Sequence, residues 1–287
     1  MSTIRIVEVG PRDGLQNERR VLGHQTRAEL VRRLAAAGLR EIEVGSMVRP
    51  DLVPQLADTD RVLADVADLS LDRSIVLVPN RRGLERALEA GAPAVAVFAA
   101  ASDTFNRRNI GRSTEDALAE FAAVAAAALA AGVPVRGYAS TIFGCPFEGA
   151  VTSAQVVPLV EAMLEMGCYE VSLGDTIGVG TPEQTHLLVE DVARAVGLER
   201  IAVHMHDTQG RGLINTLTAL DLGVPAADTS VGGLGGCPFA GEGATGNLAT
   251  ESLVAALAQR GQAVDVDLAA LTDTADWILR ELAHDPT

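Results

Sequence analysis

The chain is poor in cysteine, and the few cysteines that it has follow no familiar pattern. Its 287 residues include only Cys145, Cys168 and Cys237. Their number is odd and no two of them form a CxxC pair, so the sequence predicts neither a disulfide framework nor a thiolate zinc site.

Positive charge is also scarce. The sequence has 23 Lys and Arg against 38 Asp and Glu, which gives a formal net charge of −15. This balance argues against binding to nucleic acid or to an anionic membrane, although a local basic pocket remains compatible with it.

Long apolar runs are missing as well. No stretch approaches the roughly 20 apolar residues of a membrane-spanning helix. A strand-like segment begins at Ile4, which leaves no room for a cleaved presequence. We therefore expect a soluble, cytoplasmic protein that acts without nucleic acid or membrane.

What the chain does contain is a regular alternation of strand-like and helix-like segments. Because 48% of the residues are apolar and 21% charged, it has the composition of a packed globule. Eight strand-like segments, each followed by a helix-like one, predict a (β/α)₈ TIM barrel. The strand-like segments are residues 4–9, 41–45, 74–78, 94–98, 135–140, 170–173, 201–205 and 228–231.

A doubly wound sheet is the main alternative to the barrel. It is disfavoured because no G-x-G-x-x-G follows the first strand and because polar residues follow several different strands. Helix starts are predicted at Thr181-Pro182 and, from a capping-box pattern, at Thr26 with Glu29. We expect residues 1–287 to form a single domain, with the helices after residue 248 packed outside the barrel.

The most informative short motif is His204-Met205-His206 at the end of an apolar strand. Residues two apart in a strand point to the same side, so both imidazoles would face one way. Such a pair suggests a metal ligand set, but two hydrogen-bonded core histidines would give the same pattern.

Other polar residues stand where barrel enzymes carry their chemistry, at the carboxyl ends of strands. Two of them also have an ordinary structural explanation: Arg12-Asp13 as a turn and Asp175 as a cap of the following turn. Glu43 lies within a predicted strand, where a carboxylate would be costly if it were buried without a partner. Asn247 follows a glycine-rich loop. The thiol of Cys237 in that loop is either a small apolar group or a proton donor or acceptor.

Several longer blocks resemble the hydroxymethylglutaryl-CoA lyase family of metal-dependent barrel lyases, and the resemblance spans nearly the whole chain. The blocks are IVEVGPRDGLQNE (6–18), RGY (136–138), GCPFEG (144–149), SLGDTIGVGTP (172–182), HMHDT (204–208) and GLGGCP (233–238).

The resemblance implies roles for individual residues. Mg²⁺ or Mn²⁺ would be the cofactor. The substrate would be 3-hydroxy-3-methylglutaryl-CoA, cleaved between C2 and C3 to acetyl-CoA and acetoacetate, and assembly into a homo-oligomer is left open. The implied metal ligands are Asp13, His204, His206 and Asn247. The implied catalytic residues are Arg12, Glu43, His204 and Cys237, and those that bind substrate are Arg12, Gln16, Tyr138 and Asp175.

Small departures from the family pattern keep alternatives open. The loop between Cys237 and Asn247 is one residue longer than expected, around Glu242. A different 3-hydroxy-3-alkyl acyl-CoA or a hydroxy-keto acid therefore remains an alternative substrate. A non-catalytic acyl-CoA-binding barrel ranks last, because none of the implied catalytic and metal-binding residues is missing.

Overall fold

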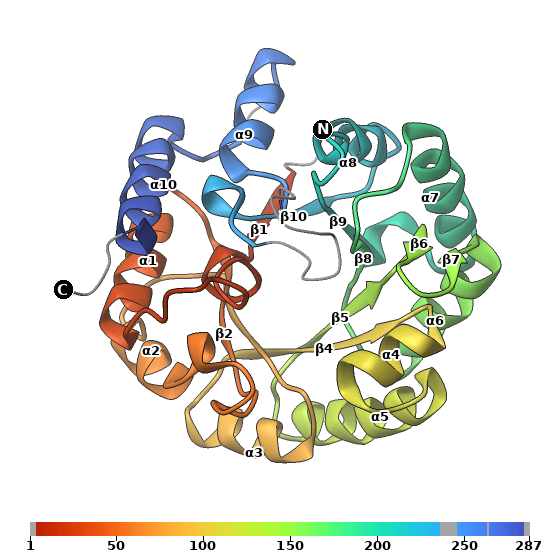
Figure 1. The fold of residues 1–287 in the computed structure, drawn as a ribbon, viewed down its shortest axis with the longest axis horizontal. Coiled ribbons are helices and arrows are strands. Elements are labelled where there is room, and N and C mark those ends of the chain that lie inside the picture. The colour runs from red at the N-terminus through yellow and green to blue at the C-terminus, as the bar shows by residue number, and fades with distance from the viewer. Residues whose placement is uncertain (1–3, 236–245, 263, 284–287) are drawn as a thin grey trace.

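Eight parallel strands close into a barrel in this computed structural model, which describes residues 4–235, 246–262 and 264–283 (Figure 1). Around the ring, each strand pairs with its neighbour in the order β1-β10-β9-β8-β5-β4-β3-β2. The TIM-barrel prediction is therefore confirmed. The strands are β1 (Arg5–Glu8), β2 (Glu41–Ser46), β3 (Arg73–Leu77), β4 (Ala94–Ala100), β5 (Val135–Ser140), β8 (Val171–Asp175), β9 (Ile201–Met205) and β10 (Ala226–Thr229).

Helices surround the ring of strands, and α9 and α10 extend this outer layer at the C-terminal end of the chain, with α10 packed against α1. The helices are α1 (His24–Ala36), α2 (Thr59–Asp65), α3 (Arg81–Glu89), α4 (Asp103–Ile110), α5 (Thr114–Ala130), α6 (Ser153–Glu165), α7 (Pro182–Val196), α8 (Gly212–Asp221), α9 (Thr250–Gln259) and α10 (Leu268–Ala283). Short helical turns are η1 (Gly10–Gly14), η2 (Pro54–Leu56), η3 (Leu198–Arg200) and η4 (Val231–Gly233). Within the described residues, no helix is both long and apolar enough to cross a membrane.

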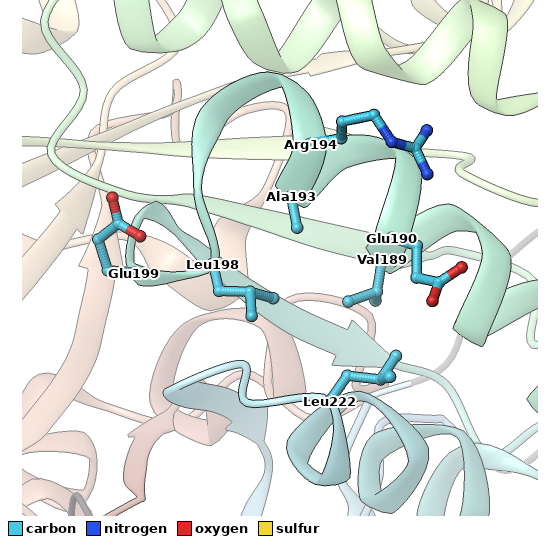
Figure 2. A pocket seen from close by; sticks show the side chains of 7 residues that line it. All are labelled: Val189, Glu190, Ala193, Arg194, Leu198, Glu199 and Leu222. Carbon is cyan, nitrogen blue, oxygen red and sulfur yellow. The ribbon is translucent and has the colours of Figure 1, made fainter.

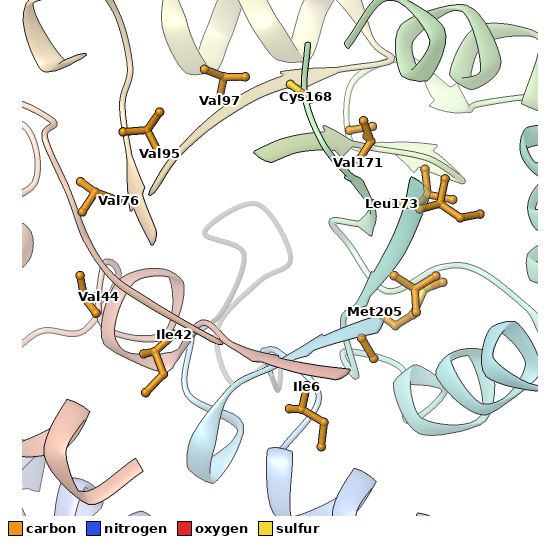
Figure 3. Close-up of a cluster of buried hydrophobic side chains, with 14 of the residues drawn as sticks. Ile6, Ile42, Val44, Val76, Val95, Val97, Cys168, Val171, Leu173 and Met205 are labelled. Atoms are coloured by element: carbon orange, nitrogen blue, oxygen red, sulfur yellow. The ribbon is translucent and has the colours of Figure 1, made fainter. Parts of the chain in front are cut away.

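Alternation along the strands divides the buried side chains into two sets. In β4, Val95 and Val97 belong to the large cluster between strands and helices, whereas Ala94 and Ala96 belong to a small cluster inside the barrel. Figure 3 shows the outer set directed away from the ring of strands. Because the outer set carries most of the apolar burial, the barrel interior is free to hold polar side chains.

The end of the barrel sheet differs from its prediction. The last strand was expected at 228–231, but β10 covers Ala226–Thr229. Ala226 and Ala227 are in register with residues of β1, and this pairing makes them strand despite the low strand propensity of alanine. A short antiparallel hairpin, β6 (Gly144–Cys145) and β7 (Gly149–Ala150), was not predicted because two-residue strands carry no periodic signal.

One predicted helix start is confirmed and one is wrong. Thr181 caps α7, accepting from the backbone N–H of Gln184 with Pro182 in the first turn. At α1 the capping box at Thr26 does not form, because the helix begins at His24 with Gly23 as its cap.

Candidate active site at the barrel mouth

The loop after β1 brings Arg12 and Asp13 together at the mouth of the barrel. Within η1, the backbone N–H groups of Arg12, Asp13 and Gly14 all converge on the carbonyl oxygen of Val9, at 3.1, 2.7 and 3.2 Å. This tight turn packs against the chain that follows β10. A Cβ atom on Gly14 would lie only 2.7 Å from the hydroxyl oxygen of Ser230, so glycine is needed for the approach.

Asp13, His204 and His206 form a compact cluster of potential ligands. One ligand atom from each lies within 4.8 Å of the others, and among the described residues this is the one group of His, Cys, Asp or Glu side chains with that property. The Nε2 atoms of the two histidines are 3.2 Å apart, and Asp13 Oδ2 is 3.8 Å from His204 Nε2. Both predicted imidazoles therefore face the same point, as the strand alternation required.

The donor set fits a divalent cation. His204 Nδ1 lies 3.3 Å from a carboxylate oxygen of Asp228, which Arg136 holds in a two-pronged ion pair. Since that carboxylate only accepts, Nδ1 donates, so Nε2 is the nitrogen that faces the cluster as a potential ligand atom. One carboxylate and two imidazoles within reach of one point make a mixed oxygen and nitrogen ligand set.

The local charges keep these groups in forms that can bind a cation. Burial lowers the pKa of His206 to about 4, so this ring is neutral near pH 7. Burial alone would raise the pKa of Asp13, but the adjacent guanidinium of Arg12 is the main cause that lowers it to about 2. Asp13 is therefore an anion facing two imidazoles.

Asn247 lies beside this cluster through a backbone bridge. It pairs with His206 in an isolated antiparallel bridge, which holds the chain after the glycine-rich loop against the end of β9. Its Nδ2 donates to Asp13 Oδ2 at 2.9 Å and to the carbonyl of Leu234 at 3.0 Å. As a ligand, the residue would have to offer its other amide atom, Oδ1.

Arg12 and Glu43 form a buried ion pair next to the cluster. Arg12 Nε donates to Glu43 Oε2 at 2.7 Å and Nη1 to Asp13 Oδ1 at 2.5 Å. Glu43 Oε1 has no hydrogen-bond partner among the described residues. Burial raises the pKa of Glu43, although Arg12 opposes the shift, so this carboxyl is a candidate for moving a proton.

The predicted substrate-binding residues Gln16 and Tyr138 also lie at the site. Gln16 Nε2 donates to Asp13 Oδ1 at 2.8 Å. The Tyr138 ring lies inside the barrel, 5.5 Å from the Arg12 guanidinium, and its buried hydroxyl has no partner within the described part of the chain. A polar substrate atom would satisfy that hydroxyl.

Of the two remaining predicted residues, Asp175 has a structural role and Cys237 cannot be placed. The buried carboxylate of Asp175 accepts the backbone N–H groups of Val179 and Gly180, at 3.1 and 2.8 Å. It therefore caps the turn that follows its strand, which is the structural alternative predicted from the sequence. Its contact with substrate stays a prediction. Cys237 lies outside the described residues.

Comparison with known proteins shows to which family the chain belongs. The family model described as HMGL-like matches residues 3–278. The chain belongs to the HMGL-like family. Among curated relatives, the bovine mitochondrial hydroxymethylglutaryl-CoA lyase is 46% identical over 279 residues, covering 97% of this chain and 86% of the relative. The Arabidopsis thaliana enzyme of the same name is 46% identical over 98% of this chain, which spans 60% of that longer protein.

Solved structures of hydroxymethylglutaryl-CoA lyases superpose closely on this chain. Hydroxymethylglutaryl-CoA lyase from Pseudomonas aeruginosa superposes with a TM-score of 0.95 at 47% identity, covering 99% of this chain and 94% of that one. The HMG-CoA lyase from Acinetobacter baumannii, in complex with coenzyme A and 3-methylmalate, has a TM-score of 0.93 at 35% identity over 99% and 92% of the two chains.

The sequence prediction missed the polar residues inside the barrel below the histidines. Asp228 is 2% exposed and Arg136 fully buried, and Arg136 also donates to Glu170 at 3.0 Å. The available signal was their position: in their strands they occupy the alternating positions that face inward, as His204 does. A pocket on the protein surface, by contrast, lies far out on the helices.

That surface feature is a shallow pocket between α7 and the end of α8. Figure 2 shows its apolar floor and charged rim. It shares no residue with the cluster of Asp13, His204 and His206, so it is not part of the candidate active site. The lining residues are Val189, Glu190, Ala193, Arg194, Leu198, Glu199 and Leu222.

Glu8 joins the two loops that carry the site. Its Oε1 accepts the N–H groups of Gly10 and Val231, at 2.8 and 2.9 Å, and its Oε2 lies 2.6 Å from the hydroxyl of Thr250. Burial raises the pKa of Glu8 to about 8, so the carboxyl is mostly neutral at pH 7. A neutral carboxyl can accept both N–H groups on one oxygen and donate from the other to Thr250.

Replacing Glu8 by glutamine should therefore preserve the network, because an amide offers one acceptor and one donor. From pH 5 to 8 the folded wild type binds a proton that the unfolded chain has lost, so its free energy of unfolding should fall with pH relative to Glu8→Gln. The slope should be at most about 1.4 kcal/mol per pH unit. Denaturant melts at three pH values check this.

Glu8→Ala is the control for that experiment. It leaves the N–H groups of Gly10 and Val231 without their acceptor, at a cost of about 1–3 kcal/mol for each unsatisfied group. Equal stability differences between wild type and Glu8→Gln at pH 5 and pH 8 would contradict the neutral carboxyl.

Proposed function

We propose that this protein is a divalent-metal-dependent carbon–carbon lyase that cleaves 3-hydroxy-3-methylglutaryl-CoA to acetyl-CoA and acetoacetate. The observation that carries the proposal is 46% identity to the bovine hydroxymethylglutaryl-CoA lyase across 97% of the chain. The cluster of Asp13 with two histidines, beside the Arg12–Glu43 pair, supplies the chemistry that such a reaction needs.

The cation proposed for this site is Mg²⁺ or Mn²⁺, held by Asp13, His204, His206 and the amide oxygen of Asn247. Oxygen and imidazole ligands without a thiolate suit these ions and leave positions for substrate oxygens. When bound, the cation would acidify the tertiary hydroxyl of the substrate and orient it.

The chain's own residues have three tasks in the cleavage. A base takes the proton of the tertiary hydroxyl, the C2–C3 bond breaks so that its electron pair forms a thioester enolate, and an acid returns a proton to C2. Arg12, fixed by Glu43, is proposed to donate to the enolate oxygen. The proposed proton carriers are Glu43, His204 and Cys237.

Two substitutions should distinguish a residue that binds the metal from one that moves protons. His206→Ala should lower Mn²⁺ affinity at least about 10-fold, since even loss of a partner behind a ligand costs 10–100-fold. Cys237→Ala should leave Mn²⁺ affinity intact and lower kcat, because its thiol is proposed to move protons only. Titration of Mn²⁺ into both variants, paired with steady-state kinetics, makes the comparison. Equal Mn²⁺ affinities would contradict the assignment.

The substrate is tested by kinetics on a panel of CoA thioesters. We expect the highest kcat/KM with 3-hydroxy-3-methylglutaryl-CoA, and lower values as the alkyl group at C3 is lengthened or the thioester is replaced by a hydroxy-keto acid. A longer alkyl group preferred over methyl would change the substrate but keep the chemistry. No cleavage of any member would overturn the proposal. A cytoplasmic location and a homo-oligomeric state stay predictions.

A further inference from the structure

Asp228 is a buried carboxylate in direct contact with one of the proposed ligands. It lies on β10 in register with His204 on β9, so the two side chains point into the barrel side by side. Its Oδ2 lies 3.3 Å from His204 Nδ1 and accepts the hydroxyl of Ser172 at 2.7 Å. Arg136 donates to both of its oxygens, at 3.0 and 2.7 Å.

These contacts determine the protonation state of Asp228. Arg136 donates to both carboxylate oxygens and Ser172 donates to one of them, so the groups around Asp228 are donors that match an ionised carboxylate. An ionised carboxylate has no proton to donate. The proton between Asp228 and His204 therefore belongs to Nδ1 of the histidine.

A chain of ion pairs also fixes the Asp228 carboxylate from the amino-terminal end of the barrel. Arg136 donates to Glu170 as well as to Asp228, and Glu170 pairs with Arg5, which in turn pairs with Glu41. The network starts at the amino-terminal ends of the strands and ends at His204. Buried ion pairs of this kind contribute little net stability. Their effect here is on geometry, because a chain of fixed donors holds the Asp228 carboxylate in one orientation.

We propose that Asp228 is a positioning residue for His204: it fixes the ring in the tautomer with hydrogen on Nδ1, so that the Nε2 lone pair points at the cluster with Asp13 and His206. The inference rests on the proposed metal-dependent function. In the opposite tautomer, an Nε2–H group would point at the cation site and exclude the ion.

The first test compares Mn²⁺ binding by wild type, Asp228→Asn and Ser172→Ala. An amide can donate to Nδ1 and so permits the wrong tautomer, as a neutral replacement does behind a catalytic histidine in serine proteases. Asp228→Asn should weaken Mn²⁺ binding about 10–100-fold. Ser172→Ala removes a hydrogen bond from the same carboxylate oxygen but keeps its charge, so its Mn²⁺ affinity should stay close to that of the wild type.

A purely structural role makes a different prediction. If Asp228 only balances the charge of Arg136, Asp228→Asn should melt at a lower temperature while its folded fraction binds Mn²⁺ as tightly as the wild type. That result overturns the inference.

The second test needs no substitution at Asp228 and so holds even if that variant fails to fold. Long-range ¹H–¹⁵N spectra of metal-free wild type, labelled at histidine nitrogen, distinguish the two tautomers. His204 and His206 are assigned with His206→Gln. We expect His204 to carry hydrogen on Nδ1, and a proton on Nε2 with Nδ1 bare overturns the inference.

The two tests also separate this inference from the proposed function. If wild type binds no Mn²⁺ and cleaves no CoA thioester, the proposed function fails. If wild type binds Mn²⁺ and folded Asp228→Asn binds it equally well, the positioning role fails alone.

Discussion

Replacing Arg12 by glutamine should lower kcat by about 10²–10³, because removal of one fixed donor to a developing oxyanion typically costs that much. The guanidinium is fixed between Glu43 and Asp13, so it needs little reorganisation as charge grows on the thioester oxygen. Metal affinity should be kept, since Arg12 offers no ligand atom. Steady-state kinetics and Mn²⁺ titration on the same preparation measure both quantities.

The same substitution also removes half of a buried ion pair, so stability has to be measured beside kcat. Breaking a buried pair by removing one partner costs about 3–5 kcal/mol, and the melting temperature of Arg12→Gln should fall. The double variant Arg12→Gln with Glu43→Gln replaces the pair by two neutral amides and should recover part of that stability. Because Glu43 is itself a proposed proton carrier, the kcat of the single variant decides the role of Arg12. A near-normal kcat of folded Arg12→Gln would make Arg12 a structural residue.

Metal removal should reduce turnover to background. The proposed ligands include no thiolate, so a chelator should strip the ion, and Mg²⁺ or Mn²⁺ added back should restore activity. The fold should survive, because the large apolar cluster between strands and helices carries most of the burial that stabilises the barrel.

The control for this experiment is the metal content itself. Elemental analysis of the stripped protein, with circular dichroism to show that the barrel remains folded, accompanies each assay. Full turnover by folded protein that holds far less than one ion per chain would remove the metal from the mechanism.

Much of the fold was readable from the sequence because its signals are local. The apolar, β-branched run predicted β9 with its observed bounds, 201–205, and strand alternation put His204 and His206 on one side of the chain. The position of Arg12 and Asp13 directly after a strand predicted that they lie at the barrel mouth. The bounds of β10 were less accurate, because pairing with β1 rather than side-chain character makes Ala226 and Ala227 strand.

The sequence alone therefore determined the order of strands and helices, the barrel, and the residues at the carboxyl ends of the strands. Only the tertiary structure decided which polar groups meet inside. Arg136 and Asp228 are 92 positions apart and bond because a closed barrel turns the inward side chains of β5 and β10 toward one axis. A local pattern shows which way a side chain points, but strand register and closure of the sheet decide what it touches.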